Sequence, residues 1–171
     1  MGQRPDGSFE RQIVDLLPRL RRFALSLTGN LTDADDLVQD TVERALNNSG
    51  RWQPGTRLDS WMYRIAQNLW IDGLRKRRRR NAAPLEEAEA VLQLDGARAA
   101  EAKLMLASVL QAMLRLPEEQ RLVASLVLVE GFGYQEAAEI LQVPLGTVTS
   151  RLARAREALA AQLVPQEKAE A

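Results

Sequence analysis

Hydrophobic residues recur at intervals of three and four positions along most of this chain, from Phe9 to Leu163. That spacing places apolar side chains on one face of an α-helix, and no segment shows the strict alternation of an amphipathic strand. The pattern therefore predicts an all-α fold. The first helix is predicted to run from Phe9 to Leu27, with Pro18 causing either a kink or a late helix start.

The second predicted helix, 33–46, has the most regular apolar pattern in the sequence. Thr32 is expected to cap its N-terminus, and Asp35 to return the capping bond. The opposite face of this helix carries acidic and amide side chains. Such a face is usually solvated, but it also fits docking onto a basic partner surface. The residues on this face are Asp36, Gln39, Asp40 and Glu43.

A third helix is predicted from Leu58 to Arg77, and it finishes in six consecutive basic residues, 75–80. The stretch 51–80 holds nine basic and two acidic residues. Adjacent cations repel one another, so the run indicates a surface that binds phosphate groups. The loop before the helix places Trp52 between two arginines, which is either a simple connection or a platform for unpaired bases. The expected buried face of the helix consists of Leu58, Trp61, Met62, Ile65, Leu69 and Leu74.

Residues 81–101 form an alanine-rich stretch with five acidic residues and one arginine. This composition predicts a flexible acidic linker between two small helical domains, 9–80 and 102–163. The second domain starts with two further predicted helices that are separated at Leu116-Pro117. Residues 1–8 and the tail after Val164 are expected to be loose ends.

The second domain ends in two helical patterns separated by a short break, 142–146, which contains Pro144 and Gly146. Two helices joined by a tight turn form a helix-turn-helix, whose second helix enters the DNA major groove. The outward face of this second helix combines small side chains with arginines suited to guanine edges or phosphates. An ordinary helical hairpin with a solvated basic face also fits this stretch alone. The outward residues are Thr149, Ser150, Ala153, Arg154 and Glu157, flanked by Arg151 and Arg156.

The composition excludes several classes of function. The 171 residues include 23 basic and 23 acidic side chains, so the net charge is zero and the chain has no uniformly basic coat. Cysteine and histidine are absent, which excludes disulfides, the usual zinc ligand sets, thiol nucleophiles and imidazole catalysis. No apolar run approaches the roughly 20 residues that span a bilayer, and no signal peptide is evident. We therefore expect a cytoplasmic protein without membrane insertion, metal or cofactor.

Four segments, in this order, resemble a bacterial RNA polymerase sigma factor of the extracytoplasmic-function class. They are DADDLVQDTVERAL (Asp33–Leu46), SWMYRIAQNLWIDGLRKRRRR (Ser60–Arg80), LPEEQR (Leu116–Arg121) and VPLGTVTSRLARAREAL (Val143–Leu159). The chain departs from the family pattern at Gly133, where a serine-like cap is usual, and at Gln142, where glycine is usual. Glycine still caps a helix acceptably, and glutamine makes a left-handed turn residue more costly.

The resemblance implies a protein that is not an enzyme. Such a factor binds core RNA polymerase and directs promoter-specific transcription initiation, here as part of a stress or envelope response under an anti-sigma factor. We expect it to be monomeric when free, with its acidic linker passing through the RNA path of the polymerase. The helix 33–46 corresponds to the one that docks on the polymerase clamp helices, which assigns polymerase binding to Asp36, Gln39, Asp40 and Glu43.

The same resemblance divides DNA recognition between the two domains. The loop Trp52–Thr56 corresponds to a segment that captures a base flipped out of the minus-ten element, and the helix after it corresponds to the one that reads and melts this element. The last helix corresponds to the reader of the minus-thirty-five element. The implied DNA-binding residues are Trp52, Thr56, Arg57, Arg64, Asn68, Arg75, Lys76, Arg77 and Arg78 in the first domain, and Thr147, Thr149, Ser150, Arg151, Ala153 and Arg154 in the second.

Three other functions compete with this interpretation. A sigma-like mimic would share the fold and sequester an anti-sigma factor without binding promoters, although such mimics usually carry a phosphoacceptor domain. A conventional helix-turn-helix regulator would need a dimer interface or a ligand domain, and it would not explain residues 60–80. A metal enzyme built on Asp35, Asp36 and Asp40 is disfavoured, because Asp35 points about 100° away from the face that the other two share. Whether the two domains pack together is left open by the sequence.

Overall fold

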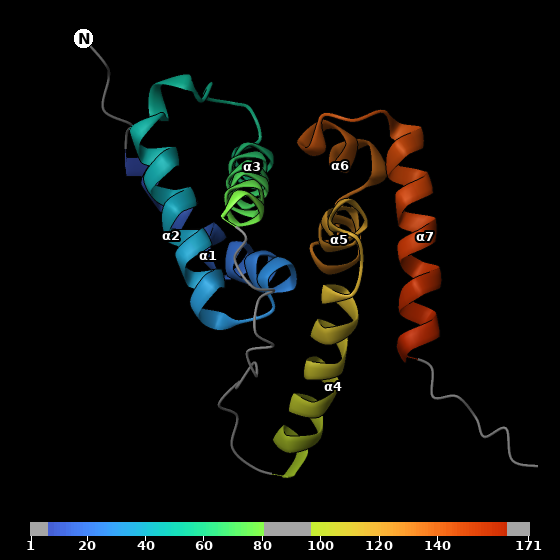
Figure 1. The fold of residues 1–171 in the computed structure, drawn as a ribbon. Helices are drawn as coiled ribbons and strands as arrows, with labels where there is room; N and C mark the ends of the chain where they lie inside the picture. Colours follow the sequence, from blue (N-terminus) through green and yellow to red (C-terminus); the bar gives the residue numbers. More distant parts are fainter. Residues whose placement is uncertain (1–6, 81–96, 164–171) are drawn as a thin grey trace, which may run out of the picture.

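The computed structural model describes residues 7–80 and 97–163, and every regular element in these ranges is helical (Figure 1). The first group of helices consists of α1 (Gly7–Thr28), α2 (Leu31–Asn47), the 3₁₀ turn η1 (Ser49–Arg51) and α3 (Leu58–Arg79). The second group consists of α4 (Ala97–Leu114), α5 (Glu118–Ala124), the π-helical turn η2 (Ser125–Val129), α6 (Tyr134–Leu141) and α7 (Leu145–Leu163). The all-α prediction is confirmed. Of the expected linker 81–101, residues 81–96 lie outside the described residues, as do the ends 1–6 and 164–171, whereas residues 97–101 already belong to α4.

Helix α1 runs through Pro18 as one element, so the predicted late start is wrong. Proline removes the hydrogen bond to the carbonyl four residues earlier, which belongs to Val14. Both residues are exposed, and Val14 keeps 60% of its surface accessible. Water can therefore solvate the carbonyl that proline leaves without a partner.

The N-terminal cap of α2 is Asn30, and the prediction of Thr32 as the cap is wrong. The Asn30 side-chain oxygen accepts a hydrogen bond from the Asp33 backbone N–H at 2.8 Å, and its amide donates to the Asp33 carboxylate at 2.8 Å. Thr32 is exposed within the first turn. The helix begins two residues earlier than its apolar pattern indicates, because Asn30 satisfies an amide that would otherwise lack a partner.

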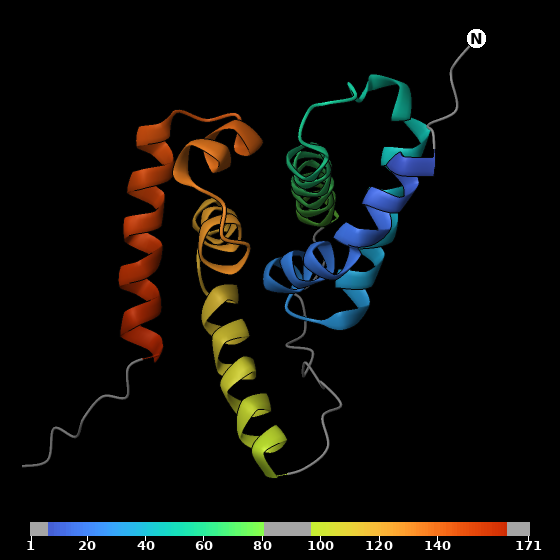
Figure 2. The same cartoon turned by 180° about the vertical axis from the view of Figure 1, so that it is seen from behind.

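Helix α3 is buried on two faces rather than one. Leu58 and Met62 are buried as predicted, whereas Trp61, Ile65, Leu69 and Leu74 are only partly buried. The residues that complete the buried set are Tyr63, Ala66, Gln67 and Trp70. Figures 1 and 2 show the reason, since α3 lies between α2 and the side of the second group that carries α5 and α6.

The two groups of helices share one hydrophobic core. Phe23 of α1 meets Tyr63 of α3 edge to face, and Tyr63 meets Phe132 of the second group in the same way, each with ring centroids 5.0 Å apart. Arg121 of α5 lies over the Trp70 ring at 5.7 Å and donates to the Leu27 carbonyl at 2.9 Å. The two groups therefore pack as one body.

We predict that Asn30→Ala lowers the free energy of unfolding by about 1 kcal/mol, the usual cost of losing an N-cap side chain. Thr32→Ala should change it by less than about 0.5 kcal/mol, as exposed substitutions generally do. Urea denaturation of the two variants measures the difference. Equal losses would contradict the assignment of Asn30 as the cap.

Candidate nucleic-acid and partner interface

The outer face of α2 presents four polar side chains to solvent. Asp36, Gln39, Asp40 and Glu43 are all exposed, and within the described part of the chain none of them makes a hydrogen bond or an ion pair. The opposite face of the helix packs on α1 and α3 through residues that include Leu37 and Ala45. The structure thus leaves this polar face free for a partner.

The loop before α3 is held by aromatic packing. The Trp52 ring lies 5.2 Å from the Phe9 ring and is partly buried, and its indole nitrogen is buried without a hydrogen-bond partner. The loop turns at Gly55, whose φ of 88° suits glycine, and the Thr56 hydroxyl donates to the Gln53 carbonyl at 2.7 Å. Trp52 therefore holds the base of the loop in place, whereas Thr56 is exposed.

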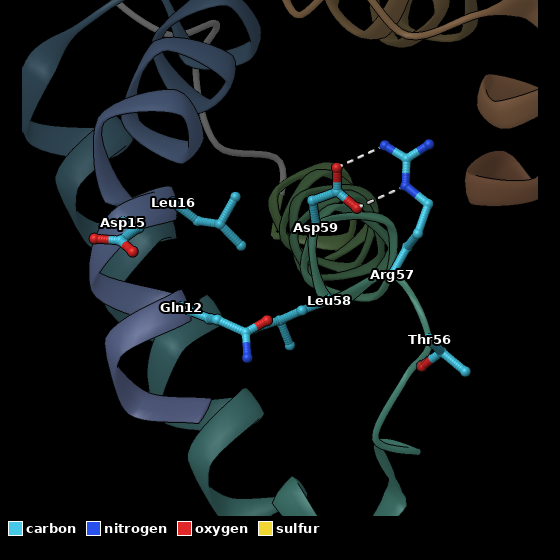
Figure 3. Close-up of a pocket in the computed structure, with 7 residues that line it drawn as sticks. All are labelled: Gln12, Asp15, Leu16, Thr56, Arg57, Leu58 and Asp59. Carbon is cyan, nitrogen blue, oxygen red and sulfur yellow. Dashed lines mark hydrogen bonds and ion pairs between the residues drawn. The ribbon is translucent and has the colours of Figure 1, made fainter. Parts of the chain in front are cut away.

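A cavity of about 330 Å³ opens between this loop and α1 (Figure 3). Gln12, Asp15 and Leu16 line it from α1, and the residues 56–59 line it from the loop and the start of α3. Its wall thus combines an amide, carboxylates, a hydroxyl and leucine side chains. Polar groups that can pair with the edge of a base and apolar groups that can contact its face are both present.

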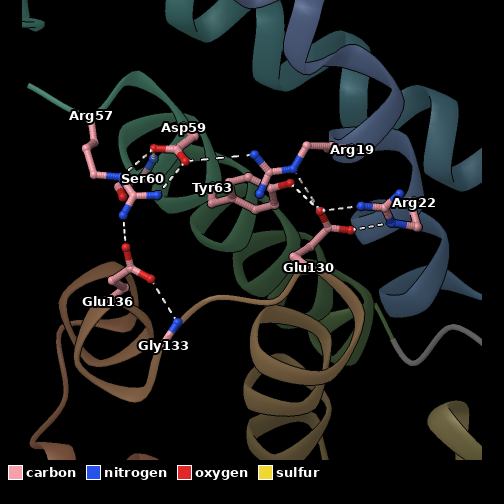
Figure 4. A network of polar contacts seen from close by, with 9 residues as sticks. All are labelled: Arg19, Arg22, Arg57, Asp59, Ser60, Tyr63, Glu130, Gly133 and Glu136. Atoms are coloured by element: carbon pink, nitrogen blue, oxygen red, sulfur yellow. Dashed lines mark hydrogen bonds and ion pairs between the residues drawn. The ribbon is translucent and has the colours of Figure 1, made fainter.

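One aspartate anchors the start of α3. Arg57 pairs with Asp59 through two hydrogen bonds of 2.7 and 3.1 Å, and the Ser60 backbone N–H donates to the same carboxylate at 2.7 Å (Figure 4). Burial acts to raise the pKa of Asp59, but the hydrogen bonds from Arg57 and Ser60 outweigh it and hold this pKa below its usual value. The hydrogen bond to Asp59 raises the pKa of Arg57.

Three of the arginines assigned to DNA binding contact the second group of helices. Arg57 forms an ion pair with Glu136 of α6, Arg64 donates to the Glu139 carbonyl at 2.8 Å, and Arg78 donates to Glu118 of α5 at 2.5 Å. Apart from Trp52 and Thr56 in the loop, the other residues of the first group that were assigned to DNA binding lie on α3. Asn68 accepts from Gln67, Arg75 pairs with Asp72 at 3.5 Å, Lys76 is exposed, and Arg77 is partly buried.

The residue that sequence reasoning missed is Glu130, whose side chain is fully buried between the two groups. Arg22 donates to its two oxygens at 2.9 and 3.0 Å, Tyr63 donates at 2.8 Å, and Arg19 lies 3.4 Å away (Figure 4). The hydrogen bond to Glu130 raises the pKa of Arg22, and burial followed by the bond to Glu130 raises the pKa of Tyr63. The sequence shows Glu130 only as a single acidic residue after the largely apolar stretch 122–129. An acidic residue in that position is usually a solvated residue at a helix end.

The helix-turn-helix forms as predicted. Gly133 caps α6, and its backbone N–H donates to the Glu136 carboxylate at 2.8 Å. Gln142 ends α6 in the left-handed conformation, with φ 55° and ψ 45°. Helix α7 then presents Thr149, Ser150, Ala153 and Arg154 to solvent, while Thr147 is partly buried and Arg151 pairs with Glu119 at 2.8 Å.

Comparison with known proteins agrees with this arrangement. The family model of Sigma-70 region 2 matches residues 13–80, and that of Sigma-70 region 4 matches residues 106–159. The ECF RNA polymerase sigma factor EcfG of Rhodopseudomonas palustris is 40% identical over 158 residues, which cover 91% of this chain and 85% of that protein. The corresponding factor SigW of Bacillus subtilis is 32% identical, with 88% and 87% covered.

The chain belongs to the extracytoplasmic-function (ECF) class of bacterial RNA polymerase sigma factors. The solved structure of the sigma factor RpoE in complex with the anti-sigma factor NepR, from Bartonella quintana, matches 94% of this sigma factor and 99% of that chain. The TM-score is 0.80 at 29% identity. An ECF sigma factor binds core RNA polymerase and promoter DNA to initiate transcription, and it is not an enzyme. Among the described residues of this one, no helix is both long and apolar enough to cross a membrane.

The turn of this helix-turn-helix yields a stability prediction. Gln142→Gly should raise the free energy of unfolding by about 0.5–1 kcal/mol, because glycine adopts the left-handed conformation without steric cost and the exposed Gln142 side chain adds no packing. Ala153→Gly, which introduces glycine into the interior of α7, should lower it by about 1 kcal/mol. Thermal or urea unfolding measures the stability of both variants against the unchanged chain. A loss of stability in Gln142→Gly would refute the claim that Gln142 holds a strained left-handed conformation.

Proposed function

We propose that this sigma factor docks on core RNA polymerase through the outer face of α2. The observation that carries this proposal is the set of four exposed polar residues without intramolecular partners, Asp36, Gln39, Asp40 and Glu43. A rigid helix that buries its other face can present such a set in fixed geometry. Because the residues are acidic or amide, the matching surface on the polymerase is basic.

Recognition of the minus-ten element is assigned to the loop before α3 and to α3 itself. The cavity beside Thr56 supports capture of a flipped base, since it offers hydrogen-bonding groups from Gln12, Asp15 and Thr56 next to Leu16. Trp52 holds the loop in place by packing on Phe9. Arg64, Asn68 and the basic run Arg75–Arg78 of α3 then contact the phosphates and bases of the melted strand.

Recognition of the minus-thirty-five element is assigned to α7. Thr149, Ser150, Ala153 and Arg154 share its exposed face, and their small size permits close approach to base edges while Arg154 can pair with guanine. Thr147 and Arg151 flank this face and are assigned to phosphates. Two such contacts on one chain strengthen each other, because the second forms at the effective concentration set by the first.

An anti-sigma factor is proposed as the regulatory partner, in a stress or envelope response. The support is the likeness to a sigma factor solved in complex with an anti-sigma factor. We place the protein in the cytoplasm, where RNA polymerase acts, and expect it to be monomeric when free. The relatives at 40% and 32% identity are sigma factors along most of their length, which favours this function over that of a mimic.

Charge reversal on α2 tests the docking surface. The double variant Asp36→Arg/Asp40→Arg should lose stoichiometric co-elution with core RNA polymerase on a sizing column, because two arginines would face a basic surface. The residues are exposed, so the fold should be unaffected, and the circular dichroism spectrum checks this.

The matched control is Glu10→Arg/Glu101→Arg, which makes the same change of charge at exposed positions of α1 and α4. This control should co-elute like the wild-type chain. Loss of co-elution in both double variants would show a general charge effect and would refute the α2 surface. A wild-type chain that never co-elutes would refute the proposed function itself.

A further inference from the structure

A hydrogen bond on the outer surface joins the two helices of the helix-turn-helix. The Arg156 guanidinium of α7 donates to the hydroxyl of Tyr134, the first residue of α6, at 3.1 Å. Both side chains are exposed, Tyr134 to 37% of its surface, so the bond lies outside the hydrophobic core. Exchange with water keeps the net stabilisation from such an exposed bond small. Its main effect is therefore to fix the direction of a long arginine side chain.

Arg156 lies on the side of α7 that carries the residues assigned to base edges. A helix turns by about 100° per residue, so Arg156 is about 20° from Thr149 and about 60° from Ala153 around the helix axis. Its guanidinium is directed toward the start of α6, which packs beside α7 (Figure 1). In a helix-turn-helix the first helix crosses the DNA backbone while the second lies in the groove. A cation between the two helices therefore stands close to phosphates at the edge of the groove.

The chemistry of its partner distinguishes Arg156 from another arginine of α7. Arg151 pairs with the Glu119 carboxylate at 2.8 Å, which offsets its charge. Arg156 is held by a neutral hydroxyl, and in the part of the chain that the structure describes it pairs with no carboxylate. A guanidinium has several N–H donors, and one bond to Tyr134 leaves the others available. Arg156 is thus oriented while it keeps its charge and most of its donors.

We propose that Arg156 binds a phosphate of the minus-thirty-five element and that Tyr134 positions it for this contact. The inference rests on the proposed function of α7 and adds two residues to it. A phosphate contact next to the face of Thr149 and Ala153 sets the register in which α7 enters the groove. Because Tyr134 restrains the guanidinium beforehand, less side-chain entropy is lost when the phosphate binds.

The salt dependence of DNA binding tests the phosphate contact. The probe is a fluorescent duplex of about 20 base pairs and arbitrary sequence, because a phosphate contact does not depend on sequence. In about 50 mM salt, Arg156→Ala should bind this duplex about ten-fold more weakly than the unchanged chain. The slope of log affinity against log salt concentration should become shallower by about 0.9, the value for one phosphate.

The matched control is Arg115→Ala. It removes the same charge from an exposed position of the second group, directly after the end of α4. Both its affinity for the duplex and its salt slope should match those of the unchanged chain. The replaced side chains are exposed, so circular dichroism should show the same helix content in all variants.

A double-mutant cycle tests the positioning role of Tyr134. Tyr134→Phe removes only the hydroxyl and should weaken duplex binding about three-fold, because the guanidinium loses its hydrogen-bond acceptor. In the background of Arg156→Ala, the same change should have no further effect, since no guanidinium is left to position. A purely structural role of Tyr134 would instead weaken binding by the same factor in both backgrounds.

Two results would overturn the proposal. One is an affinity and a salt slope of Arg156→Ala that equal those of Arg115→Ala. The other is an effect of Tyr134→Phe that persists unchanged in the background of Arg156→Ala.

Failure of this inference can be distinguished from failure of the proposed function. Arg154→Ala should also weaken duplex binding, so a loss in that variant without a loss in Arg156→Ala would keep α7 as the reader and refute the role of Arg156. An unchanged chain that does not bind the duplex at any salt concentration would refute the assignment of α7 to DNA and this inference with it. Co-elution with core polymerase depends on α2, and every variant named here should retain it.

Discussion

The packing of the two groups of helices depends on the ion pairs and hydrogen bonds of one buried carboxylate, that of Glu130. An ion removed from water costs several kcal/mol unless charges and hydrogen bonds replace the water. Arg19, Arg22 and Tyr63 supply them, and all three belong to the other group of helices. The π-helical turn η2 ends directly before Glu130, and Gly131 follows with a φ of 76°, so the backbone bends sharply at this residue. The ion pairs and hydrogen bonds of Glu130 thereby join the two groups at the centre of their contact.

A zero net charge has a structural meaning in this sigma factor. The stretch 51–80 holds nine of its 23 basic residues, and acidic residues of the second group pair with two of them, Arg57 and Arg78, inside the same molecule. The face of α2 and the exposed face of α7 take no part in that neutralisation. The surfaces proposed for polymerase and for the minus-thirty-five element therefore stay exposed, whereas Arg57, Arg64 and Arg78 contact the second group.

The sequence was most informative about local structure. Periodicity located the helices, and the resemblance to a family in which glycine is usual at position 142 indicated the left-handed conformation of Gln142. Periodicity failed where α3 is covered on two faces, since the polar Tyr63 is buried against Glu130 and Phe132 of the second group, and the polar Gln67 is buried as well. It also failed at Asn30 and Glu130, because the role of each depends on a hydrogen-bond partner that apolar spacing does not report.

The central claim is that the two groups of helices share one core and pack as one body, and the unfolding of the chain tests this directly. All three tryptophans, at positions 52, 61 and 70, lie in the first group, whereas far-ultraviolet circular dichroism reports the helices of both groups. In a urea titration, a shared core predicts that tryptophan fluorescence and circular dichroism follow a single transition with the same midpoint. Two different midpoints would show that the groups unfold independently, and would contradict the shared core.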